Sequence, residues 1–343
     1  MKPVTKDDVL DLMDASLTSA ALGTALELGL FWLLESRPLD AKSVAIELGI
    51  PPLRCYYWLQ LLCRTGLIEE SSHGYKASST ARTAILEAYS QDSWTLLAEE
   101  ARGRLPGLCD LPIHIRESGS AWDALGLSRP TYVDRMLEEP ERARRFTRML
   151  YELHQPLADE LAGFLDLSGV KRLMDLGGGS GVISIEFVRR NPKLTAVVVD
   201  IPNVCVAGLE IAAENALEDR IIYHPANFLH DDLPLGFDMV LECDVDVYSE
   251  TLFRKVKTAL NPGGRFVIVD QLAPAEGVAP PSRLNWAFEG SMMSPEFMFL
   301  TKAQILEQLK NAGFQLLSEK ALPSESASCS RFTNGLVVIE AQK

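Results

Sequence analysis

Three glycines at alternate positions, Gly177, Gly179 and Gly181, stand between the apolar run KRLMDL and the helical pattern VISIEFVRR. Glycine lets the backbone turn sharply and approach a ligand closely, so such a turn after a strand predicts a binding site. The dinucleotide fingerprint, GxGxxG or GxGxxA, needs a small sixth residue, and Val182 occupies that position here. That small residue lets a helix close around a pyrophosphate, so the observed spacing favours a ligand without one.

A carboxylate stands at the end of the next apolar run, where LTAVVVD finishes at Asp200. An acid about twenty residues beyond such a turn can accept hydrogen bonds from both ribose hydroxyls, each worth roughly 1.5–3 kcal/mol. The alternative is that Asp200 caps the helix that begins at Pro202. Because the glycine turn is present we predict the ribose role, and the two features together predict a site for S-adenosylmethionine (SAM).

The elements that must position these residues follow Gly169, where runs of strand length alternate with helical stretches. The strand-like runs are KRLMDL, LTAVVVD, RIIYHPA, FDMVLEC, GRFVIVDQL, FQLLSEK and NGLVVIEAQ. Helical stretches such as VCVAGLEIAAENA and ETLFRKVKTAL lie between them. The alternation predicts an α/β fold, with a mostly parallel sheet and helices on both faces.

The first hundred residues have a different pattern, of helices and one hairpin. Apolar residues recur at helical spacing over residues 8–32, Asp40 precedes the helical stretch AKSVAIELGI, and a proline pair at 51–52 opens LRCYYWLQLLCRTG. Residues 67–75 have the pattern of a short hairpin. Helix, turn, helix and hairpin together predict a winged-helix domain.

Winged helices often bind DNA, which makes the charges of this region informative. The second helix is mainly apolar, with Arg54 and Arg64 as its only basic residues, and the wing carries Glu69 and Glu70. A DNA reader needs Arg, Lys, Asn or Gln facing bases and phosphates. The pattern therefore favours a buried helix and a dimerisation module over DNA binding.

Length and composition narrow the classes further. A chain of 343 residues with 47% hydrophobic and 23% charged residues predicts a globular protein of two unequal domains. The net charge of −14 argues against a nucleic-acid partner, which would need phosphates neutralised. No secretory pattern and no apolar run of the ~20 residues that span a membrane are present, so we expect no membrane partner. Six scattered cysteines without CxxC, and histidines without HxxxH or HExxH spacing, predict no metal site and favour the cytoplasm.

From residue 8 to the C-terminus the chain resembles the class I small-molecule O-methyltransferases that carry an N-terminal winged-helix dimerisation domain. That family includes plant caffeate-type and bacterial natural-product enzymes. The resemblance rests on ALELGLF at residues 25–31, the helix-turn-helix and wing, SGVKRLMDLGGGSG, VVVDIPNV, EDRIIYHPANFL and ALNPGGRFVIVDQ, in the family's order.

The resemblance implies a Rossmann-like, seven-stranded SAM methyltransferase domain preceded by a mainly α winged-helix dimerisation domain. It divides the chain into residues 1–100 and 101–343, with 101–167 as a helical connector that roofs the acceptor pocket and 168–343 as the core. It further implies a cytoplasmic homodimer that methylates a small aromatic or polyketide-like metabolite, on oxygen in the first instance. Methylation of carbon or nitrogen, and a SAM-binding regulatory homologue with altered or lost catalysis, are the alternatives.

The resemblance also implies roles for individual residues in the cofactor site. The three glycines would line the methionine and ribose, and Asp200 would hold the ribose. Phe228 would flank the adenine or serve as an ordinary core aromatic. The cofactor-binding residues predicted in this way are Asp175, Gly177, Gly179, Gly181, Asp200, Asn227, Phe228 and Glu242, with Asp175 beside the amino group and Asn227 at the adenine amine.

The chain departs from the family at the general base, which lies in a Leu-His-Asp-Trp motif. The segment Val245-Asp246-Val247-Tyr248 aligns with that motif, so Asp246 stands at the histidine position. A carboxylate is a weak base unless its pKa is raised, and Asp244, which alternates with Asp246 along a strand-like segment, would raise it by like charge. The alternative is that Asp246 caps the helix that begins near Ser249.

Two further residues are candidates for catalysis, and a third family position has changed. Asp270 aligns with one supporting acid of the family, whereas the other aligns near Phe299, which is no acid. His154 is a candidate substitute base on the connector, or a hydrogen-bonded structural residue. The predicted catalytic residues are therefore Asp246, Asp270 and His154.

Methionine and aromatic side chains predict a flat, hydrophobic acceptor. The substrate-binding residues we predict are Phe146, Met149, Trp286, Met292, Met293 and Phe299, with Phe288, Phe297 and Met298 as further members of the set. The alternative for each of them is ordinary core packing.

Overall fold

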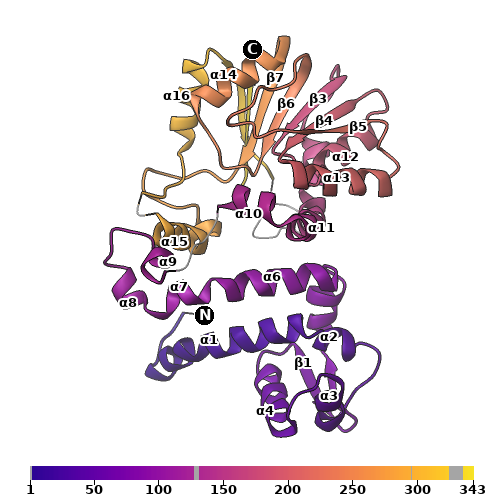
Figure 1. The fold of residues 1–343 in the computed structure, drawn as a ribbon, viewed down its shortest axis with the longest axis vertical. Coiled ribbons are helices and arrows are strands. Elements are labelled where there is room, and N and C mark those ends of the chain that lie inside the picture. The colour runs from indigo at the N-terminus through magenta and orange to yellow at the C-terminus, as the bar shows by residue number, and fades with distance from the viewer. Residues whose placement is uncertain (1, 127–130, 295, 324–334) are drawn as a thin grey trace. The chain divides into compact units, whose positions relative to one another are not determined.

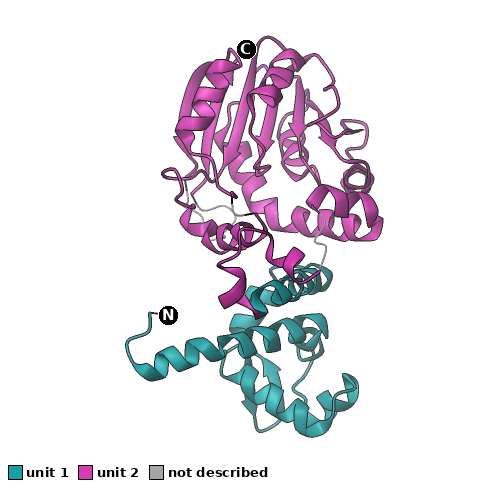
Figure 2. Cartoon of the chain, turned by 60° about the vertical axis from the view of Figure 1, so that its left-hand side comes forward, with its two compact units in different colours: residues 1–109 teal, residues 110–343 magenta. Residues whose placement is uncertain are grey.

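The computed structural model describes residues 2–126, 131–294, 296–323 and 335–343 (Figure 1). The chain divides into two compact units, residues 1–109 and residues 110–343 (Figure 2). The first unit is mainly helical, and the second contains a seven-stranded sheet with its helices.

The first unit consists of helices and a two-stranded hairpin, and its helices begin where the sequence predicts. Thr5 and Asp8 form a capping box at the start of the first helix, the Asp40 side chain accepts the Ser43 N–H, and Pro52 opens the helix of the proline pair. The elements are α1 (Lys6–Glu27), α2 (Leu30–Leu33), α3 (Ala41–Glu47), α4 (Pro52–Cys63), β1 (Ile68–Ser71), β2 (Gly74–Ala77), α5 (Ser79–Ala81), η1 (Arg82–Leu86), α6 (Gln91–Gly103) and α7 (Leu105–Cys109).

The first unit extends past residue 100 because α6 packs along α1. The Arg102 guanidinium donates two hydrogen bonds to the Glu27 carboxylate, both at 3.1 Å. Ala98 of α6 is buried in the same core cluster as Ala25 and Leu30. This contact keeps α6 with the first unit.

The N-terminal half of α1 exposes an apolar stripe. Leu10, Met13 and Leu17 recur at helical spacing and are 57%, 71% and 65% exposed. By length and composition α1 could also cross a membrane, and it is the one helix of the described residues with that property. The sequence prediction that α4 is buried holds only in part, because Leu59 and Leu62 are buried whereas Leu53 and Tyr57 are exposed.

The second unit begins with short helices and one long helix that packs beside the sheet domain. The long helix α11 (Pro140–Phe164) contacts the first two helices of the sheet domain. Arg148 ties it to the second of these, with Nη2 at 2.9 Å from Glu210 Oε2 and 2.7 Å from Glu214 Oε1. The shorter elements are α8 (Leu111–His114), α9 (Ala121–Ala124) and α10 (Tyr132–Glu138).

The sheet has the order β5-β4-β3-β6-β7-β9-β8, with β3 to β7 parallel and β9 antiparallel to both of its neighbours. This confirms the predicted α/β fold and its seven strands. The strands are β3 (Arg172–Leu176), β4 (Thr195–Asp200), β5 (Ile221–Pro225), β6 (Phe237–Cys243), β7 (Leu260–Asp270), β8 (Gln315–Ala321) and β9 (Val337–Gln342).

Helices cover both faces of the sheet, as Figure 1 shows. One core cluster joins the sheet to α11, α12 (Val182–Arg190) and α13 (Pro202–Glu214), and the other joins it to α14 (Glu250–Ala259) and α16 (Lys302–Asn311). The chain order reverses at β3, which pairs with β4 on one side and β6 on the other. In open α/β sheets, ligands bind at the carboxyl ends of the strands at such a reversal, and the predicted site residues lie there.

Candidate active site

The glycine turn connects β3 to α12 through three left-handed residues. Gly177, Gly179 and Gly181 have φ values of 69°, 54° and 72°, which side chains rarely adopt. A Cβ on Gly177 would lie 2.8 Å from Cγ2 of Val245. A Cβ on Gly181 would collide with the hydroxyl of Tyr223, which donates to the Ser180 carbonyl at 2.8 Å. The turn therefore needs glycine both for its conformation and for its close neighbours.

Asp200 ties the end of β4 to this turn. Its Oδ2 accepts the Gly179 N–H at 2.9 Å, and its Oδ1 accepts the Ile201 N–H at 2.7 Å. Burial raises the pKa of Asp200 to about 6, against the effect of these two hydrogen bonds. A carboxylate has about four acceptor sites, so two remain for hydroxyl groups of a ligand. The cap residue of α13 is Ile201, which makes no side-chain cap.

Asp175 lies beneath the turn and is 1% exposed. Its Oδ2 accepts a hydrogen bond from the Ser184 hydroxyl at 2.7 Å, and burial raises its pKa to about 6. A Cβ on Gly178 would collide with the Asp175 carboxylate. Asp175 therefore lies directly behind the glycine turn, with its carboxylate close to the backbone of Gly178.

The segment after β5 brings Asn227 and Phe228 to the same end of the sheet. Asn227 Oδ1 accepts the Leu229 N–H at 3.2 Å and keeps a second lone pair. The Cε1 atom of Phe228 lies 3.6 Å from the position of a Gly177 Cβ, while the ring also packs against the core. The ring therefore belongs to the core and also borders the turn, and its contact with adenine stays a prediction.

The acidic segment after β6 differs from the strand-like segment that the sequence predicts. The strand ends at Cys243, and Asp244 and Asp246 have left-handed φ values of 55° and 58°. Aspartate tolerates this conformation better than most residues. The carboxylates of Asp244 and Asp246 do point to one common partner. They do so because both residues are left-handed, and not because they alternate along a strand. The alternative that Asp246 caps α14 is wrong, because the Ser249 hydroxyl accepts the Leu252 N–H.

Arg283 is the shared partner, and it is 8% exposed. Its Nη1 lies 2.5 Å from Asp246 Oδ2, and its Nη2 contacts Asp244 Oδ1 and lies 3.2 Å from Asp270 Oδ1. Its Nε donates to Gln271 Oε1 at 2.8 Å. The oxygens of the three aspartates gather closely enough to hold a metal ion, but the guanidinium already provides the positive charge among them.

The three aspartates titrate differently because their surroundings differ. Burial raises the pKa of Asp270 to about 8, and the charges of Asp246 and Asp244 add to that effect. Burial also raises the pKa of Asp246, with Arg283 opposing. For Asp244 burial acts upward too, but hydrogen bonds and charges from His154 and Arg283 outweigh it and lower the pKa. Groups whose pKa values are pushed apart in this way are typical of proton-transfer sites.

Glu242 lies within the sheet at the end of β6 and is fully buried. Among the described residues neither of its carboxyl oxygens has a hydrogen-bond partner. Burial, followed by the charges of Asp270 and Asp246, raises its pKa well above the usual value. Burial therefore favours the protonated form of Glu242, while its predicted cofactor contact stays a prediction.

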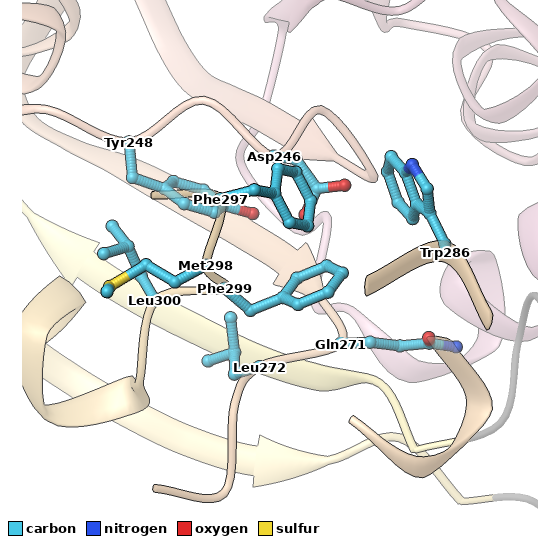
Figure 3. Close-up of a pocket in the computed structure, with 9 residues that line it drawn as sticks. All are labelled: Asp246, Tyr248, Gln271, Leu272, Trp286, Phe297, Met298, Phe299 and Leu300. Atoms are coloured by element: carbon cyan, nitrogen blue, oxygen red, sulfur yellow. The ribbon is translucent and has the colours of Figure 1, made fainter. Parts of the chain in front are cut away.

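A pocket opens beside Asp246 (Figure 3). The Trp286 ring lies edge-on to Phe299 at 5.7 Å between centroids, and Phe297 lies 5.4 Å from Phe299. Arg283 lies over the Trp286 ring at 4.9 Å. The residues that line the pocket are Asp246, Tyr248, Gln271, Leu272, Trp286, Phe297, Met298, Phe299 and Leu300.

Comparisons with known proteins agree with this geometry. A model of the O-methyltransferase domain matches residues 114–315, and a model of the O-methyltransferase dimerisation domain matches residues 10–86. The chain belongs to the O-methyltransferase family. A 3-hydroxy-5-methyl-1-naphthoate 3-O-methyltransferase of Streptomyces sahachiroi is 30% identical over 79% of this chain and 78% of that protein.

Further relatives agree with the family and the fold. An L-tyrosine C(3)-methyltransferase of Streptomyces lavendulae is 28% identical over 85% of this chain and 82% of its own length. The structure of PigF with SAH has the same fold, with a TM-score of 0.83 at 19% identity over 99% of this chain and all of that one. The protein is thus a SAM-dependent methyltransferase.

The methyltransferase brings some of the predicted acceptor residues together and places others elsewhere. Trp286 and Phe299 line the pocket. Phe146 packs with Ile201 and Val204, Met292 and Met293 pack with Trp122, and Met149 is 3% exposed. The roles of these four in binding an acceptor stay predictions.

His154 lies beside Asp244 in the methyltransferase and is not one of the residues that line the pocket. Its Nδ1 lies 3.0 Å from the Leu150 carbonyl oxygen, and its Nε2 lies 3.4 Å from Asp244 Oδ2. His154 is thus placed to support an aspartate that itself binds Arg283.

Sequence reasoning missed Arg283 and the contact of Tyr248 with Asp270. The Tyr248 hydroxyl donates to Asp270 Oδ2. No spacing rule connects Arg283 with residues 244–246, which lie about forty positions earlier. A signal was present for Tyr248, because it stands where the family motif has Trp and adds a hydroxyl group that Trp lacks.

Proposed function

We propose that the enzyme methylates a hydroxyl group of a small aromatic or polyketide-like metabolite held in the pocket beside Asp246. The single observation that supports this most is the pocket wall, where the Asp246 carboxylate and the Tyr248 side chain stand among three aromatic rings. A flat, apolar acceptor fits the rings, and the oxygens beside them can take its proton.

The residues around the glycine turn fit SAM. Gly177, Gly179 and Gly181 leave backbone free of side chains, and Asp200 keeps acceptor sites for ribose hydroxyls. Asn227 and Phe228 border the same space and would meet the adenine. When bound, SAM supplies a sulfonium methyl group. Val245 joins this site to the pocket, since it touches Gly177 and precedes Asp246 in the chain.

The chain's own contribution is to hold the acceptor and to remove its proton. Orientation can lower a barrier by about 7–11 kcal/mol, and general-base help adds typically about 10²–10⁴-fold. Asp246 carries the base role in this proposal, with Arg283 holding its carboxylate in place. Asp270 contacts Tyr248 and Arg283, and His154 contacts Asp244. Through these contacts Asp270 and His154 support Asp246.

The relatives support an aromatic acceptor and leave a second outcome to test. The naphthoate relative methylates an oxygen by its name, and the L-tyrosine relative methylates a carbon of a phenol. A carboxylate beside a phenol can serve either reaction, because both need the phenolic proton removed. Methylation of carbon is therefore the second candidate function.

The experiment is an assay of S-adenosylhomocysteine release with phenols, naphthols, enolic polyketide models and arylamines, followed by product structure. O-methyl ethers from flat aromatic hydroxyls support the proposal, and ring-methylated products favour the second candidate. Two results contradict the proposal. One is S-adenosylhomocysteine release with arylamines alone. The other is no release with any acceptor while calorimetry shows tight SAM binding.

We also propose that the enzyme is a cytoplasmic homodimer of secondary metabolism, joined through a winged-helix first unit. The support is the dimerisation-family match together with the exposed apolar stripe of α1 and the exposed Leu53 and Tyr57 of α4. A second copy fits these surfaces better than DNA does, because the hairpin exposes Glu69 and Glu70. Duplex DNA binding with a steep salt dependence would instead favour a regulatory protein.

A further inference from the structure

The Asp246 carboxylate, the proposed base, is held in an ion pair that opposes the effect of burial on its pKa. Its Oδ2 lies 2.5 Å from Nη1 of Arg283, and an ion pair of this kind stabilises the ionised carboxylate. Burial still raises the pKa of Asp246 overall, and the ion pair limits that gain in proton affinity. The pocket therefore gains from a second path by which a proton can leave.

Tyr248 provides such a path. It lines the pocket (Figure 3). Its hydroxyl donates a hydrogen bond to Oδ2 of Asp270. Asp270 is completely buried and is not itself a lining residue. Its other oxygen accepts the Gln271 N–H at 2.6 Å and lies 3.2 Å from Arg283 Nη2. Among the groups that bond to Asp270, the Tyr248 hydroxyl belongs to a side chain that lines the pocket, and a hydroxyl can both accept and give up a proton. The Asp246 side chain, which also lines the pocket, is a second hydrogen-bonding neighbour of Asp270.

We propose that Tyr248 is a catalytic residue, which passes the acceptor's hydroxyl proton to the Asp270 carboxylate. This rests on the proposed function, the methylation of a hydroxyl oxygen. The O–H bond of the acceptor breaks as a new O–H bond forms at the Tyr248 oxygen. The original Tyr248 O–H bond breaks as its proton bonds to Asp270 Oδ2. The methyl group replaces the proton on the acceptor oxygen, Tyr248 stays neutral, and Asp270 ends protonated.

The charges around the pair suit this direction of transfer. Burial raises the pKa of Asp270 to about 8, with Asp246 and Asp244 adding and Arg283 and the Tyr248 hydrogen bond opposing. Burial raises the pKa of Tyr248 well above 10, so Tyr248 conducts a proton without holding the charge. The titratable and charged groups that face the pair are Asp244, Asp246, Arg283, Glu242 and Cys243.

The sign of the pH dependence follows from these directions. Asp270 must be ionised to accept the proton, so turnover should rise as the pH rises through about 8. Asp246 and Glu242 also have raised pKa values, but neither bonds to the Tyr248 hydroxyl. Loss of the hydroxyl should therefore remove the rise that belongs to Asp270 and leave the Asp246 contribution.

The first experiment compares Tyr248→Phe with wild type on 2-naphthol and on the more acidic 6-cyano-2-naphthol. We expect kcat on 2-naphthol to fall by about 10²–10⁴-fold, with KM and SAM affinity unchanged. The defect should shrink on the cyano compound, because an acceptor that is already ionised needs no base. Tyr151→Phe is the matched control. It also removes one tyrosine hydroxyl, which lies on α11 and donates to Asn215 Oδ1 at 3.2 Å.

A second measurement needs no acceptor. The ultraviolet absorbance of Tyr248, taken as wild type minus Tyr248→Phe, should shift as Asp270 titrates near pH 8, and Asp270→Asn should abolish the shift. A flat difference spectrum overturns the relay, as does Tyr248→Phe turnover within twofold of wild type, or an equal defect on both naphthols. If wild type methylates neither naphthol, O-methylation of phenols fails, and the absorbance shift alone then decides whether Tyr248 and Asp270 are coupled.

Discussion

Val245 lies against Gly177, so that a Cβ added to the glycine would come within 2.8 Å of the valine Cγ2. The contact joins two elements that are far apart in the sequence, the glycine turn after β3 and the acidic segment after β6. Two left-handed aspartates flank Val245 and direct their carboxylates to Arg283. The position of the acid groups therefore depends on the absence of a side chain in the turn.

Gly177→Ala should weaken SAM binding and stability together. Alanine at a φ of 69° costs about 1–2 kcal/mol and also meets Val245. If the cost falls on the bound form, SAM affinity drops roughly tenfold, which calorimetry can measure. Val245→Ala in the same chain should restore part of the loss, because it removes the collision and leaves the backbone strain. No recovery in the double variant would show that the Val245 contact is irrelevant.

Asp200→Ala should abolish SAM binding, because the variant loses both the ribose acceptor and the bond that holds Gly179. The pKa of Asp200 is raised to about 6, so its ionised form dominates only above that pH. SAM affinity should accordingly fall as the pH drops below about 6, and calorimetry at several pH values checks this. Asp232→Ala, which removes an exposed acid, is the control. Undiminished affinity of Asp200→Ala would remove it from the cofactor site.

Asp246→Asn should spare SAM binding and reduce turnover, by about 10²-fold or more if Asp246 takes the acceptor proton. The amide keeps the size of the side chain but loses the charge that pairs with Arg283 at 2.5 Å. Calorimetry with SAM and the release assay separate the two effects. Turnover equal to wild type would remove Asp246 from the mechanism.

The part of the fold that could be predicted is the part that local spacing controls. The Gly177 turn follows a strand and precedes a helix. The end of β4 at Asp200 lies next to it because β3 and β4 are parallel neighbours that pair Leu176 with Val199. These two features predict the cofactor site before any tertiary contact is known. The first residues of α3, which Asp40 caps, and of α4, which begins at Pro52, were predictable for the same reason.

The arrangement of the acid groups could not be predicted in this way. Asp244 and Asp246 were expected to share a face of a strand, whereas two left-handed residues direct them to Arg283. Aspartate tolerates the left-handed conformation, but the sequence does not say which aspartates adopt it, because the surrounding structure decides that. The same holds for the Tyr248 contact with Asp270, which joins the segment after β6 to the end of β7.

Leu17→Lys should dissociate the proposed homodimer. The side chain is 65% exposed in the isolated chain, on the same stripe as Leu10 and Met13. A lysine buried against a second copy loses the hydration of its ammonium group and finds no partner for its charge on an apolar surface. Sedimentation should show the monomer mass, with SAM affinity per chain retained. Val206→Lys, at a residue that is 60% exposed in the second unit, should leave the mass unchanged. A dimeric Leu17→Lys would place the interface elsewhere.

Glu242→Met should stabilise the protein, and more so at high pH. Glu242 is fully buried without a hydrogen-bond partner among the described residues, and such a group costs about 1–3 kcal/mol. Its folded pKa is raised, so the wild type keeps its stability below the unfolded pKa of the group and loses it as the pH rises toward the folded value. Denaturant unfolding should therefore show a gain for Glu242→Met that is larger at pH 9 than at pH 5. Glu218→Met, at an exposed position, should show no such difference between the two pH values. If Glu242→Met gives the same gain at both pH values, or lowers the free energy of unfolding, then the fold stabilises the buried carboxyl.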